Sequence, residues 1–279
     1  MTLPSIQALL KKHNIRAKKS FSQNFLTPTP TLEKIIQQLD PQPSDLVIEI
    51  GPGLGLMTAM LAKKVKRVIA IEYDPTMLEI AQDEFAEIKN IDWIHADFLE
   101  YNLQDLKTVN LKIIGNIPYE ITSPILFKLL ENKTNLKTAV LLMQKEVAKR
   151  IVATPNCKDY GILAVRLQAE ALCTKCFDVS AKSFIPAPKV DSSVVKIEYH
   201  NNFPQDENND LLLYFAQLVK AAFAKRRKTL RNALLGSRLN LGAEKLDTAL
   251  TRLQIEQKRR AESLSIEEFK RLAKELFSP

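Results

Sequence analysis

Residues 45–55, Asp-Leu-Val-Ile-Glu-Ile-Gly-Pro-Gly-Leu-Gly, decide the fold of this chain. The apolar run at their start predicts a buried parallel strand over 45–51, and a helical pattern follows over 56–65. Three of the seven glycines of the whole chain separate the two elements: Gly51, Gly53 and Gly55. A glycine-rich turn between a strand and a helix lets backbone N–H groups approach a ligand at the helix N-terminus. The stretch therefore predicts a nucleoside-binding turn, although a purely structural turn would show the same pattern.

The spacing of these glycines excludes two phosphate-binding motifs. Leu56 stands where the dinucleotide fingerprint requires its third glycine. The Walker pattern is also absent, because no Gly-Lys-Ser or Gly-Lys-Thr follows the turn. The expected cofactor is therefore a nucleoside without a pyrophosphate group.

Acidic residues stand at the ends of the next two predicted strands. The second strand covers 67–74, and its Glu72 lies 72 − 51 = 21 positions after Gly51. A carboxylate at that distance reaches the hydroxyl groups of a bound ribose and accepts hydrogen bonds from both. The third strand covers 91–98, and Asp97 near its end can accept a hydrogen bond from an adenine amino group. The aromatic neighbours that would lie against the adenine ring are Tyr73 and Phe98.

The fourth predicted strand, 111–117, leads into Gly-Asn-Ile-Pro-Tyr at 115–119. Asn116 offers an amide at the strand tip, and Pro118 stiffens the turn and aims the main-chain carbonyls of Ile117 and Pro118. Tyr119 adds a flat ring beside them. Two acceptors next to a stacking face suit an exocyclic amine on a planar base. Taken alone, the pentapeptide is equally consistent with an ordinary strand end and proline turn.

Strands and helices alternate through the first half of the chain. Beyond the elements above, the pattern predicts helices over 31–39, 75–88, 121–131 and 145–153 and a fifth strand over 138–144. This alternation predicts an α/β doubly wound sheet, in which ligands bind beyond the carboxyl ends of the strands. Gly51, Glu72, Asp97 and Asn116 all lie at such ends, on four successive strands. Together they predict S-adenosylmethionine as the cofactor.

Composition and charge set the protein class. The 279 residues carry a formal net charge of +8 and have a pI near 9.2, which favours a polyanionic partner. The cysteines, Cys157, Cys173 and Cys176, cannot all pair, which favours a reducing compartment. Cys173 and Cys176 form a lone CxxC, for which a strand is expected and a metal site is not. We see no signal peptide and no membrane-spanning run, and so expect a cytoplasmic protein, with nothing that demands more than a monomer.

Two basic stretches are candidate RNA-binding surfaces. The first lies in a basic N-terminal arm covering 1–26, and its cations are Lys11, Lys12, Arg16, Lys18 and Lys19. The second packs five cations into seven positions: Lys225, Arg226, Arg227, Lys228 and Arg231. Each would contact phosphates, and a solvated face is the alternative in both cases.

The chain is expected to form two domains. A catalytic domain covers 1–203 and ends with a strand over 192–199, which we expect to pair with 172–179 at the sheet edge. A helical domain covers 204–279, because the pattern after the polar linker at 201–210 is helical throughout.

The motifs in this order resemble the KsgA family of small-subunit rRNA adenine dimethyltransferases over nearly the whole chain. They are Lys-Lys-Ser-Phe-Ser-Gln-Asn-Phe-Leu at 18–26, Ile-Glu-Ile-Gly-Pro-Gly-Leu-Gly at 48–55, Ile-Glu-Tyr-Asp at 71–74, Ala-Asp-Phe at 96–98, Gly-Asn-Ile-Pro-Tyr at 115–119, Phe-Ile-Pro-Ala-Pro-Lys-Val-Asp-Ser-Ser-Val at 184–194 and Phe-Ala-Lys-Arg-Arg-Lys-Thr-Leu-Arg-Asn-Ala-Leu at 223–234. Ser22 and Ile117 replace the usual Gly and Leu, and neither change removes a functional group.

The resemblance implies a Rossmann-like methyltransferase sheet with a small all-helical C-terminal domain. It implies that Asn24, Leu26, Gly51, Glu72, Asp97 and Asn116 contact the methyl donor. Asn116 to Tyr119 would also hold the target adenine, with Phe184 as a second aromatic against it. The implied activity is N6,N6-dimethylation of two adjacent adenosines in a hairpin loop near the 3′ end of 16S rRNA in the 30S particle, with a role in small-subunit biogenesis. The alternatives are a large-subunit rRNA methylase of the antibiotic-resistance type and a non-catalytic RNA-binding assembly factor.

Overall fold

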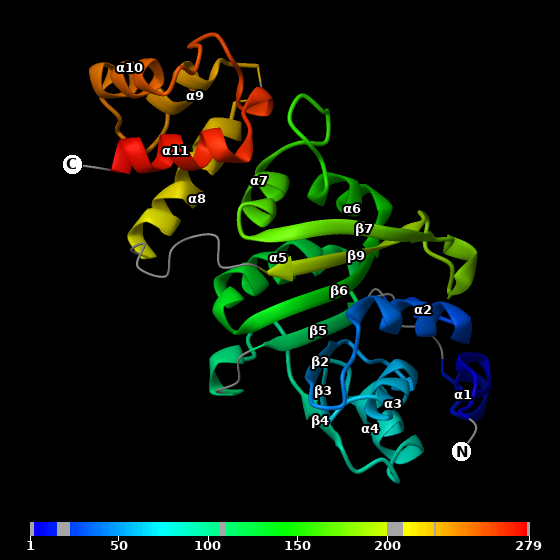
Figure 1. Ribbon diagram of the computed structural model, residues 1–279. Coiled ribbons are helices and arrows are strands. Elements are labelled where there is room, and N and C mark those ends of the chain that lie inside the picture. The colour runs from blue at the N-terminus through cyan, green and yellow to red at the C-terminus, as the bar shows by residue number, and fades with distance from the viewer. Residues whose placement is uncertain (1–2, 16–22, 107–109, 200–208, 226, 278–279) are drawn as a thin grey trace. The chain divides into compact units, whose positions relative to one another are not determined.

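The structure is a computed structural model that describes residues 3–15, 23–106, 110–199, 209–225 and 227–277 (Figure 1). The chain divides into two compact units. The first comprises Met1–Ala148 with Thr174–Tyr199, and the second comprises Lys149–Cys173 with His200–Pro279. Among the described residues, no helix has both the length and the apolar character needed to cross a lipid bilayer.

A seven-stranded sheet forms the centre of the first unit, with the strand order β4-β3-β2-β5-β6-β9-β7. The strands are β2 (Leu46–Ile50), β3 (Arg67–Glu72), β4 (Ile91–His95), β5 (Leu111–Asn116), β6 (Leu136–Gln144), β7 (Ala171–Val179) and β9 (Ser192–Tyr199). β2 to β6 are parallel, and β9 runs antiparallel to β6. The doubly wound sheet is confirmed, as is the pairing of β7 with β9 at its edge.

The helices begin and end close to their predicted positions. They are α2 (Thr29–Leu39), α3 (Leu56–Ala62), α4 (Pro75–Glu84), α5 (Thr122–Glu131) and α6 (Lys145–Ile151). The start of α4 shows why: Asp74 accepts a hydrogen bond from the N–H of Thr76, 3.0 Å away, and Pro75 supplies a helical φ at the first position.

One helix was not predicted from the sequence. α1 (Ile6–Lys12) begins at Ser5, whose hydroxyl accepts from the N–H of Ala8 at 3.2 Å. Ile6 and Leu9, spaced for one helical face, are buried in the core of the first unit. This short apolar pattern stands directly before the basic residues of the N-terminal stretch.

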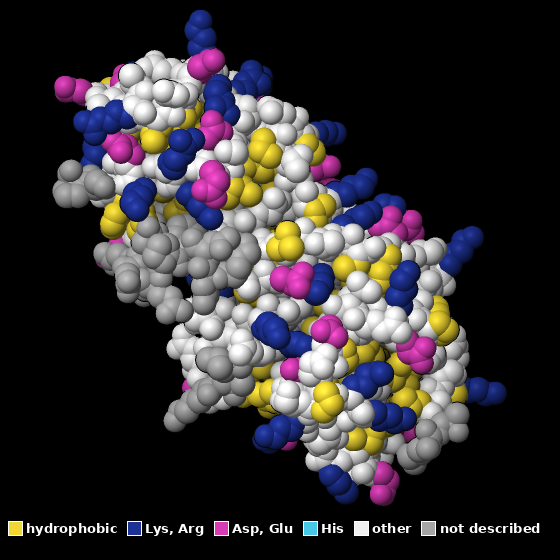
Figure 2. Space-filling view, viewed as in Figure 1, with side chains coloured by type: hydrophobic (Ala, Val, Ile, Leu, Met, Phe, Trp, Pro, Cys, Tyr) yellow, Lys and Arg dark blue, Asp and Glu magenta, His cyan; other side chains and the backbone are white. Residues whose placement is uncertain are grey.

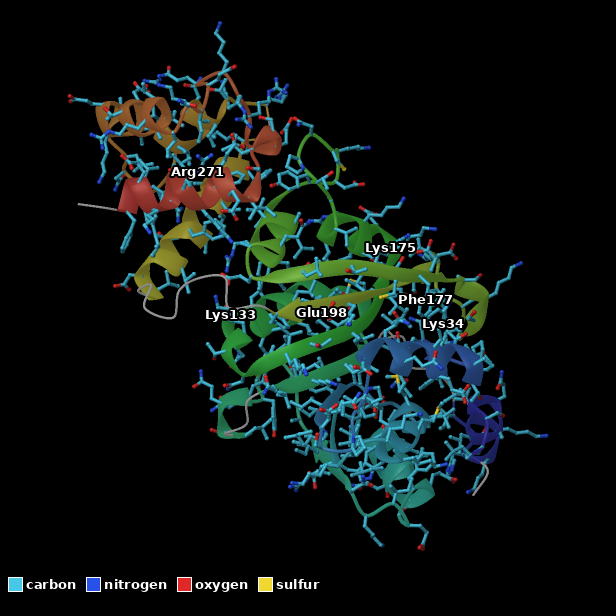
Figure 3. The ribbon with its side chains drawn as sticks, viewed as in Figure 1. Lys34, Lys133, Lys175, Phe177, Glu198 and Arg271 are labelled. Atoms are coloured by element: carbon cyan, nitrogen blue, oxygen red, sulfur yellow. The ribbon has the colours of Figure 1, made fainter. Side chains whose placement is uncertain are left out.

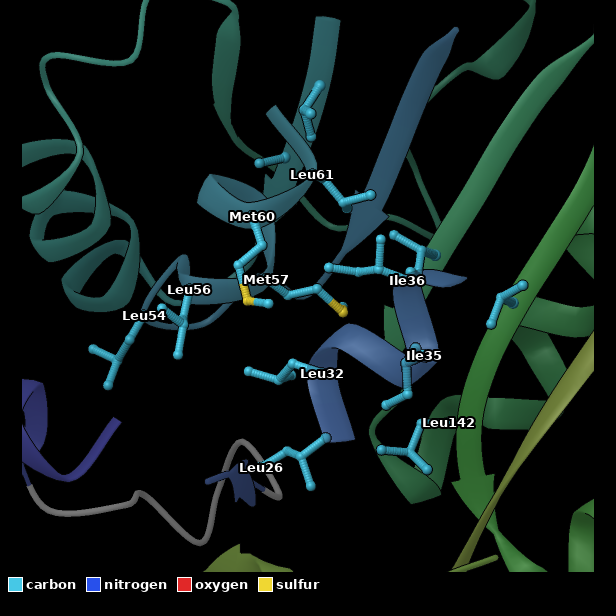
Figure 4. Packing of buried hydrophobic residues seen from close by; sticks show 14 of the residues in the cluster. Leu26, Leu32, Ile35, Ile36, Leu54, Leu56, Met57, Met60, Leu61 and Leu142 are labelled. Carbon is cyan, nitrogen blue, oxygen red and sulfur yellow. The ribbon is translucent and has the colours of Figure 1, made fainter. Parts of the chain in front are cut away.

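The core between the sheet and its covering helices is made of aliphatic and methionine side chains. In the close view, Leu32 and Ile36 of α2 lie toward Met57 of α3, and Ile35 lies beside Leu142 of β6 (Figure 4). Burying each such side chain stabilises the fold by roughly 1.5–3 kcal/mol. Outside this core, Lys34 on the exposed side of α2 lies with its ammonium group 4.1 Å from the ring centroid of Phe177 on β7 (Figure 3).

The strand order places the ligand site. From β2 the chain crosses to β3 on one side, and from β5 it crosses to β6 on the other. A crevice opens beyond the carboxyl ends of two strands where the winding reverses. Gly51 follows β2 and Asn116 ends β5, so both residues lie at the crevice where the winding of the sheet reverses.

Gly115 allows β2 and β5 to approach closely at the same point. A Cβ atom at this position would lie 2.7 Å from the carbonyl oxygen of Ile50 and 3.0 Å from Cδ1 of Ile117. We expect Gly115→Ala to lower the free energy of unfolding by about 3 kcal/mol, because backbone atoms cannot move aside as a side chain can. Denaturant titration measures this. Gly242→Ala, where a Cβ meets nothing within 4 Å, should cost less than about 1 kcal/mol, and equal losses would refute the steric explanation.

The second unit is helical and has its own core. Its helices are α7 (Ile162–Gln168), α8 (Asn209–Phe223), α9 (Leu230–Leu235), α10 (Ala243–Arg252) and α11 (Ile266–Phe277). The rings of Phe223 and Phe269 stack at 5.8 Å between centroids, and the hydroxyl of Tyr160 donates to the carbonyl of Leu264 at 2.9 Å. Residues 149–173 thus pack with the C-terminal helices, although the sequence-based boundary at 203/204 assigned them to the catalytic domain.

Candidate active site

A cavity of about 340 Å³ lies beyond the carboxyl ends of the parallel strands in the first unit. It brings together every residue that was predicted to contact the cofactor: Asn24, Leu26, Gly51, Gly53, Glu72, Tyr73, Asp97, Phe98 and Asn116. Pro118 and Tyr119 also line it. One cavity therefore joins the predicted cofactor residues to the predicted catalytic turn.

Glu72 anchors the glycine-rich turn. Its carboxylate, at the end of β3, accepts hydrogen bonds from the N–H of Gly53 at 2.9 Å and from the N–H of Asp74 at 2.8 Å. Burial, the largest cause, raises the pKa of Glu72, while hydrogen bonds from the backbone N–H groups of Asp74, Gly53 and Tyr73 oppose that rise. The same carboxylate that faces the cavity therefore also fixes the turn.

The positive φ angles of Gly51, Gly53 and Gly55 explain the concentration of glycine in this turn. Gly55 has a second reason: a Cβ there would lie 2.7 Å from the Trp93 ring. A Cβ at Gly51 would meet nothing within 4 Å, so there the positive φ rather than lack of space favours glycine.

The carboxylates that follow β3 and β4 are held by both distant and local hydrogen bonds. Asp97 accepts from the N–H of Leu99 at 2.8 Å, which fixes its side chain in a turn. Asp74 accepts from the side-chain amide of Gln23 at 2.8 Å, a contact that ties the chain just before Asn24 to the start of α4. Tyr73 is largely exposed beside them, so its ring is accessible from the cavity.

Asn116 is oriented by the main chain of a distant segment. Its side-chain amide nitrogen donates to the carbonyl oxygen of Asn24 at 2.9 Å. Within the part of the chain that the structure describes, the Oδ1 atom of Asn116 accepts no hydrogen bond. One N–H of the amide is therefore engaged by the main chain, and the acceptor oxygen is left for a ligand.

Of the main-chain carbonyls of Ile117 and Pro118, one is engaged in hydrogen bonds and the other is left for a ligand. The carbonyl of Pro118 accepts from the N–H of Ile121 at 3.3 Å and from the hydroxyl of Thr122 at 3.2 Å. Across residues 3–277 with the gaps given above, no donor reaches the carbonyl of Ile117. The main-chain acceptor that remains beside Asn116 is thus that of Ile117 rather than that of Pro118.

Tyr119 is held by a residue that the sequence did not single out. Its hydroxyl lies 2.8 Å from Oγ of Ser192, a fully buried residue at the start of β9. Antiparallel pairing sets Ser192 opposite Gln144, at the end of β6, which brings it to the same edge of the sheet. Burial is the main cause that raises the pKa of Tyr119, so its phenol stays neutral and can hold this bond.

Phe184 is the one predicted catalytic residue that does not line the cavity. It is 3% exposed and lies in the core of the first unit. Phe184 and Ile185 form β8, which pairs antiparallel with β1 (Phe25–Leu26), so that Phe184 stands opposite Leu26. In this structure Phe184 therefore supports the wall of the cavity, and its contact with a base stays a prediction.

Glu49 is a residue of the site that sequence reasoning missed. It lies inside β2, is 1% exposed, and lines the cavity. An acid between isoleucines in a buried strand was the available signal, since carboxyl groups are almost never fully buried without a partner. The described lining residues include several carboxyl groups and no Lys, Arg or His, so the cavity favours a cationic ligand.

RNA contact by the basic residues stays a prediction. Arg16, Lys18, Lys19 and Arg226 lie outside the described residues. Lys12 pairs with Glu84, as does the His13 ring at 2.6 Å, and Lys11 is exposed beside them. Lys225, Arg227 and Lys228 are exposed. On the face in view, basic side chains of the second unit lie among acidic ones (Figure 2).

Arg231 is engaged within the second unit. Its guanidinium group makes two hydrogen bonds to Asp247, at 2.6 and 2.8 Å, which lower the pKa of that carboxyl. A bidentate pair of this kind uses the donors that a phosphate would need. Arg231 is thus a weaker candidate for RNA contact than its three exposed neighbours.

The cysteines are free thiols, and Cys173 and Cys176 lie in β7, as expected. Among the residues that the structure describes, no group of three or more His, Cys, Asp or Glu is placed to hold a metal ion.

The class of protein follows from a mainly parallel sheet with this order, a glycine turn after β2, acids at the end of β3 and after β4, and a cavity whose described lining includes no Lys, Arg or His. It is a Rossmann-like, S-adenosylmethionine-dependent methyltransferase. The family model of ribosomal RNA adenine dimethylase matches residues 14–277. The chain belongs to the ribosomal RNA adenine dimethylase family, and it is an rRNA adenine dimethyltransferase.

Individual relatives and solved structures support this family assignment. The chain is 40% identical to ribosomal RNA small subunit methyltransferase A of Alkaliphilus metalliredigens, over 97% of this chain and 95% of that one. A dimethyladenosine transferase from Plasmodium falciparum matches with a TM-score of 0.78 and 28% identity, over 89% of this chain and 95% of that chain. The 23S rRNA methyltransferase ErmE matches with a TM-score of 0.70 and 26% identity, over 91% of this chain and 100% of that chain.

The residues present fit S-adenosylmethionine. The cofactor carries positive charge, and the cavity offers carboxyl groups without a competing cation among its described residues. One of these, Glu49, has a buried Oε2 atom without a hydrogen-bond partner in the described chain. Glu72 and Asp97 present acceptors on adjoining strands, as hydroxyl and amino donors of an adenosine require.

Proposed function

We propose that this enzyme dimethylates two adjacent adenosines in a hairpin loop near the 3′ end of 16S rRNA, on the 30S particle. The single observation that carries the site assignment is the hydrogen bond from Asn116 to the Asn24 carbonyl, which leaves an acceptor in the cavity. The small-subunit relatives support the choice of rRNA. We further infer that it acts as a monomer in the cytoplasm and contributes to small-subunit assembly.

The target amine is a poor nucleophile, because its lone pair is delocalised into the adenine ring. Oδ1 of Asn116 and the main-chain carbonyl of Ile117 would accept its two hydrogens and favour a pyramidal nitrogen with an available lone pair. S-adenosylmethionine supplies an already activated methyl group. Alignment by these two acceptors therefore provides much of the rate enhancement.

The turn must also stabilise an unstacked base. Taking an adenine out of an RNA loop costs a few kcal/mol, which stacking on an aromatic ring offsets by roughly 1–3 kcal/mol. Tyr119 lines the cavity, and Ser192 fixes its orientation. Tyr119 is the ring that we assign to this role.

We expect Tyr119→Ala to reduce turnover about 10- to 100-fold, because the stacking energy is lost. Tyr119→Phe keeps the ring and loses only the bond to Ser192, so it should keep most of the activity. Single-turnover methylation of 30S particles measures both. Equal loss in the two variants would mean that the hydroxyl, not the ring face, is what matters.

A second candidate is methylation of 23S rRNA, which the likeness to ErmE favours. The higher identity of the small-subunit relatives supports the first candidate. Incubating the enzyme with labelled donor and either unmethylated 30S or 50S particles, followed by mass mapping of the nucleosides, tests the choice. Dimethyladenosine confined to 50S would refute the 16S assignment.

RNA contact by the second unit is expected at Lys225, Arg227 and Lys228, which are exposed between α8 and α9. Each phosphate contact adds about 0.7–0.9 to the slope of log affinity against log salt. Replacing all three by Ala should therefore lower affinity at low salt and reduce this slope by about two to three. Arg231→Ala should leave the slope unchanged. If the slope changed only in the Arg231 variant, the assignment of RNA contact to these three residues would be wrong.

A further inference from the structure

Glu49 has no part in the roles assigned above. It lies in β2, lines the cavity and is 1% exposed, and its Oε2 atom has no hydrogen-bond partner among the described residues. Leaving a buried polar atom without a partner is unfavourable. Such an atom at a ligand site indicates a partner that arrives with the ligand.

The groups that face Glu49 come from each neighbouring element. Glu72 on β3 is the nearby charge, and α3 contributes the hydroxyl of Thr58 and no ionisable residue. On β5, the ammonium group of Lys112 lies 2.7 Å from the carboxylate of Asp45, at the ends of the strands away from the cavity. The other titratable groups lining the cavity are Tyr73, Asp97, Tyr119 and Glu120. None of the described groups brings a positive charge to Glu49.

These surroundings determine the charge of Glu49. Burial, the largest cause, raises its pKa to about 8, the Thr58 hydroxyl opposes the rise, and the charge of Glu72 adds to it. The side chain is therefore mainly a neutral acid at pH 7 when no cation is present.

We propose that Glu49 is a proton-linked selector for positive charge: it keeps its proton in the empty cavity and releases it to solvent when the cationic methyl donor binds. This rests on the use of S-adenosylmethionine by the proposed function. S-adenosylhomocysteine shares the adenosine, amino and carboxylate groups and lacks only the methyl group and the sulfonium charge. Because the sulfonium charge is the charge that the product lacks, we expect the proton release to accompany the donor and not the product.

The affinity for the methyl donor should therefore depend on pH. Below about pH 8 the donor must displace a proton, so its affinity rises by up to about tenfold per pH unit between pH 6 and 8 and then levels off. The affinity for S-adenosylhomocysteine has no such contribution from Glu49. The ratio of the two dissociation constants therefore changes with pH, although the amino group common to both ligands titrates too.

Isothermal titration calorimetry in buffers of different ionisation enthalpy at pH 7 counts the protons released. With the wild-type protein we expect S-adenosylmethionine to release up to about one proton more than S-adenosylhomocysteine. Glu49→Gln should abolish this difference and shift the affinity ratio toward the product. Glu120→Gln, which removes an exposed carboxylate of the same cavity, should retain the difference.

Equal proton release for the two ligands in the wild type, which needs no variant, overturns the proposal, and so does a difference that survives in Glu49→Gln. If neither ligand binds the wild type, the cofactor assignment itself has failed, and this is distinct from binding with equal release.

The empty protein offers a second readout. The pKa of Glu49 is raised on folding, so its contribution to stability is full below its unfolded pKa and is lost as pH rises toward about 8. Wild type should lose thermal stability relative to Glu49→Gln over that range. A constant difference in Tm between the two would show that Glu49 is already ionised, which also overturns the proposal.

Discussion

Replacing Asn116 by Ala is expected to lower the single-turnover rate of methyl transfer by about 10²-fold or more. The variant loses Oδ1, which would accept a hydrogen of the target amine, and also the 2.9 Å bond that fixes the side chain to the Asn24 carbonyl. Donor affinity should fall less than about tenfold, because Glu72 and Asp97 remain. Rapid-quench assays and calorimetry separate the two quantities.

The matched control is Asn102→Ala. Asn102 is an exposed asparagine that does not line the cavity, and its variant should methylate at the wild-type rate. Normal turnover by the Asn116 variant would mean that the amine is held by other groups, and the mechanism proposed for the Asn116–Tyr119 turn would have to be abandoned.

Replacing Glu72 by Ala is expected to weaken S-adenosylmethionine binding by at least about 10²-fold. The change removes the acceptor predicted for the ribose and leaves the N–H groups of Gly53 and Asp74 without their partner. Each lost bond to a charged group is worth about 1.5–3 kcal/mol, so the glycine turn should loosen as well as lose affinity. Calorimetry gives the first effect, and thermal unfolding of the empty protein gives the second.

Glu79→Ala serves as the control, since Glu79 is an exposed acid on α4, a few residues further along. It should leave both quantities unchanged. Should the Glu72 variant bind the donor within about threefold of wild type, the carboxylate at the end of β3 would not be the ribose ligand.

The places of Gly51, Glu72 and Asp97 in the fold were predictable because their determinants are local, whereas Asn24 and Leu26 were given only by the family resemblance. A glycine turn after a buried strand and acids at strand ends follow from strand periodicity, and the parallel sheet then gathers them at one edge. The turn at Asn116 was predictable for the same reason.

The rest depends on contacts that no local pattern records. Ser192 reaches Tyr119 only through the antiparallel pairing of β9 with β6. Phe184 was assigned to the base by resemblance, whereas its pairing with Leu26 buries it in this structure. The apolar pattern of β2 predicts the strand but gives no role for the acid within it, so Glu49 was missed.

The pairing of β1 with β8 has a consequence for synthesis. The wall formed by Asn24, Phe25 and Leu26 is held by residues 184–185, far along the chain. A growing polypeptide therefore has its glycine turn and its acids long before that wall can form. High-affinity capture of the methyl donor should begin only once the whole first unit has left the ribosome, so that donor binding marks completion of that unit.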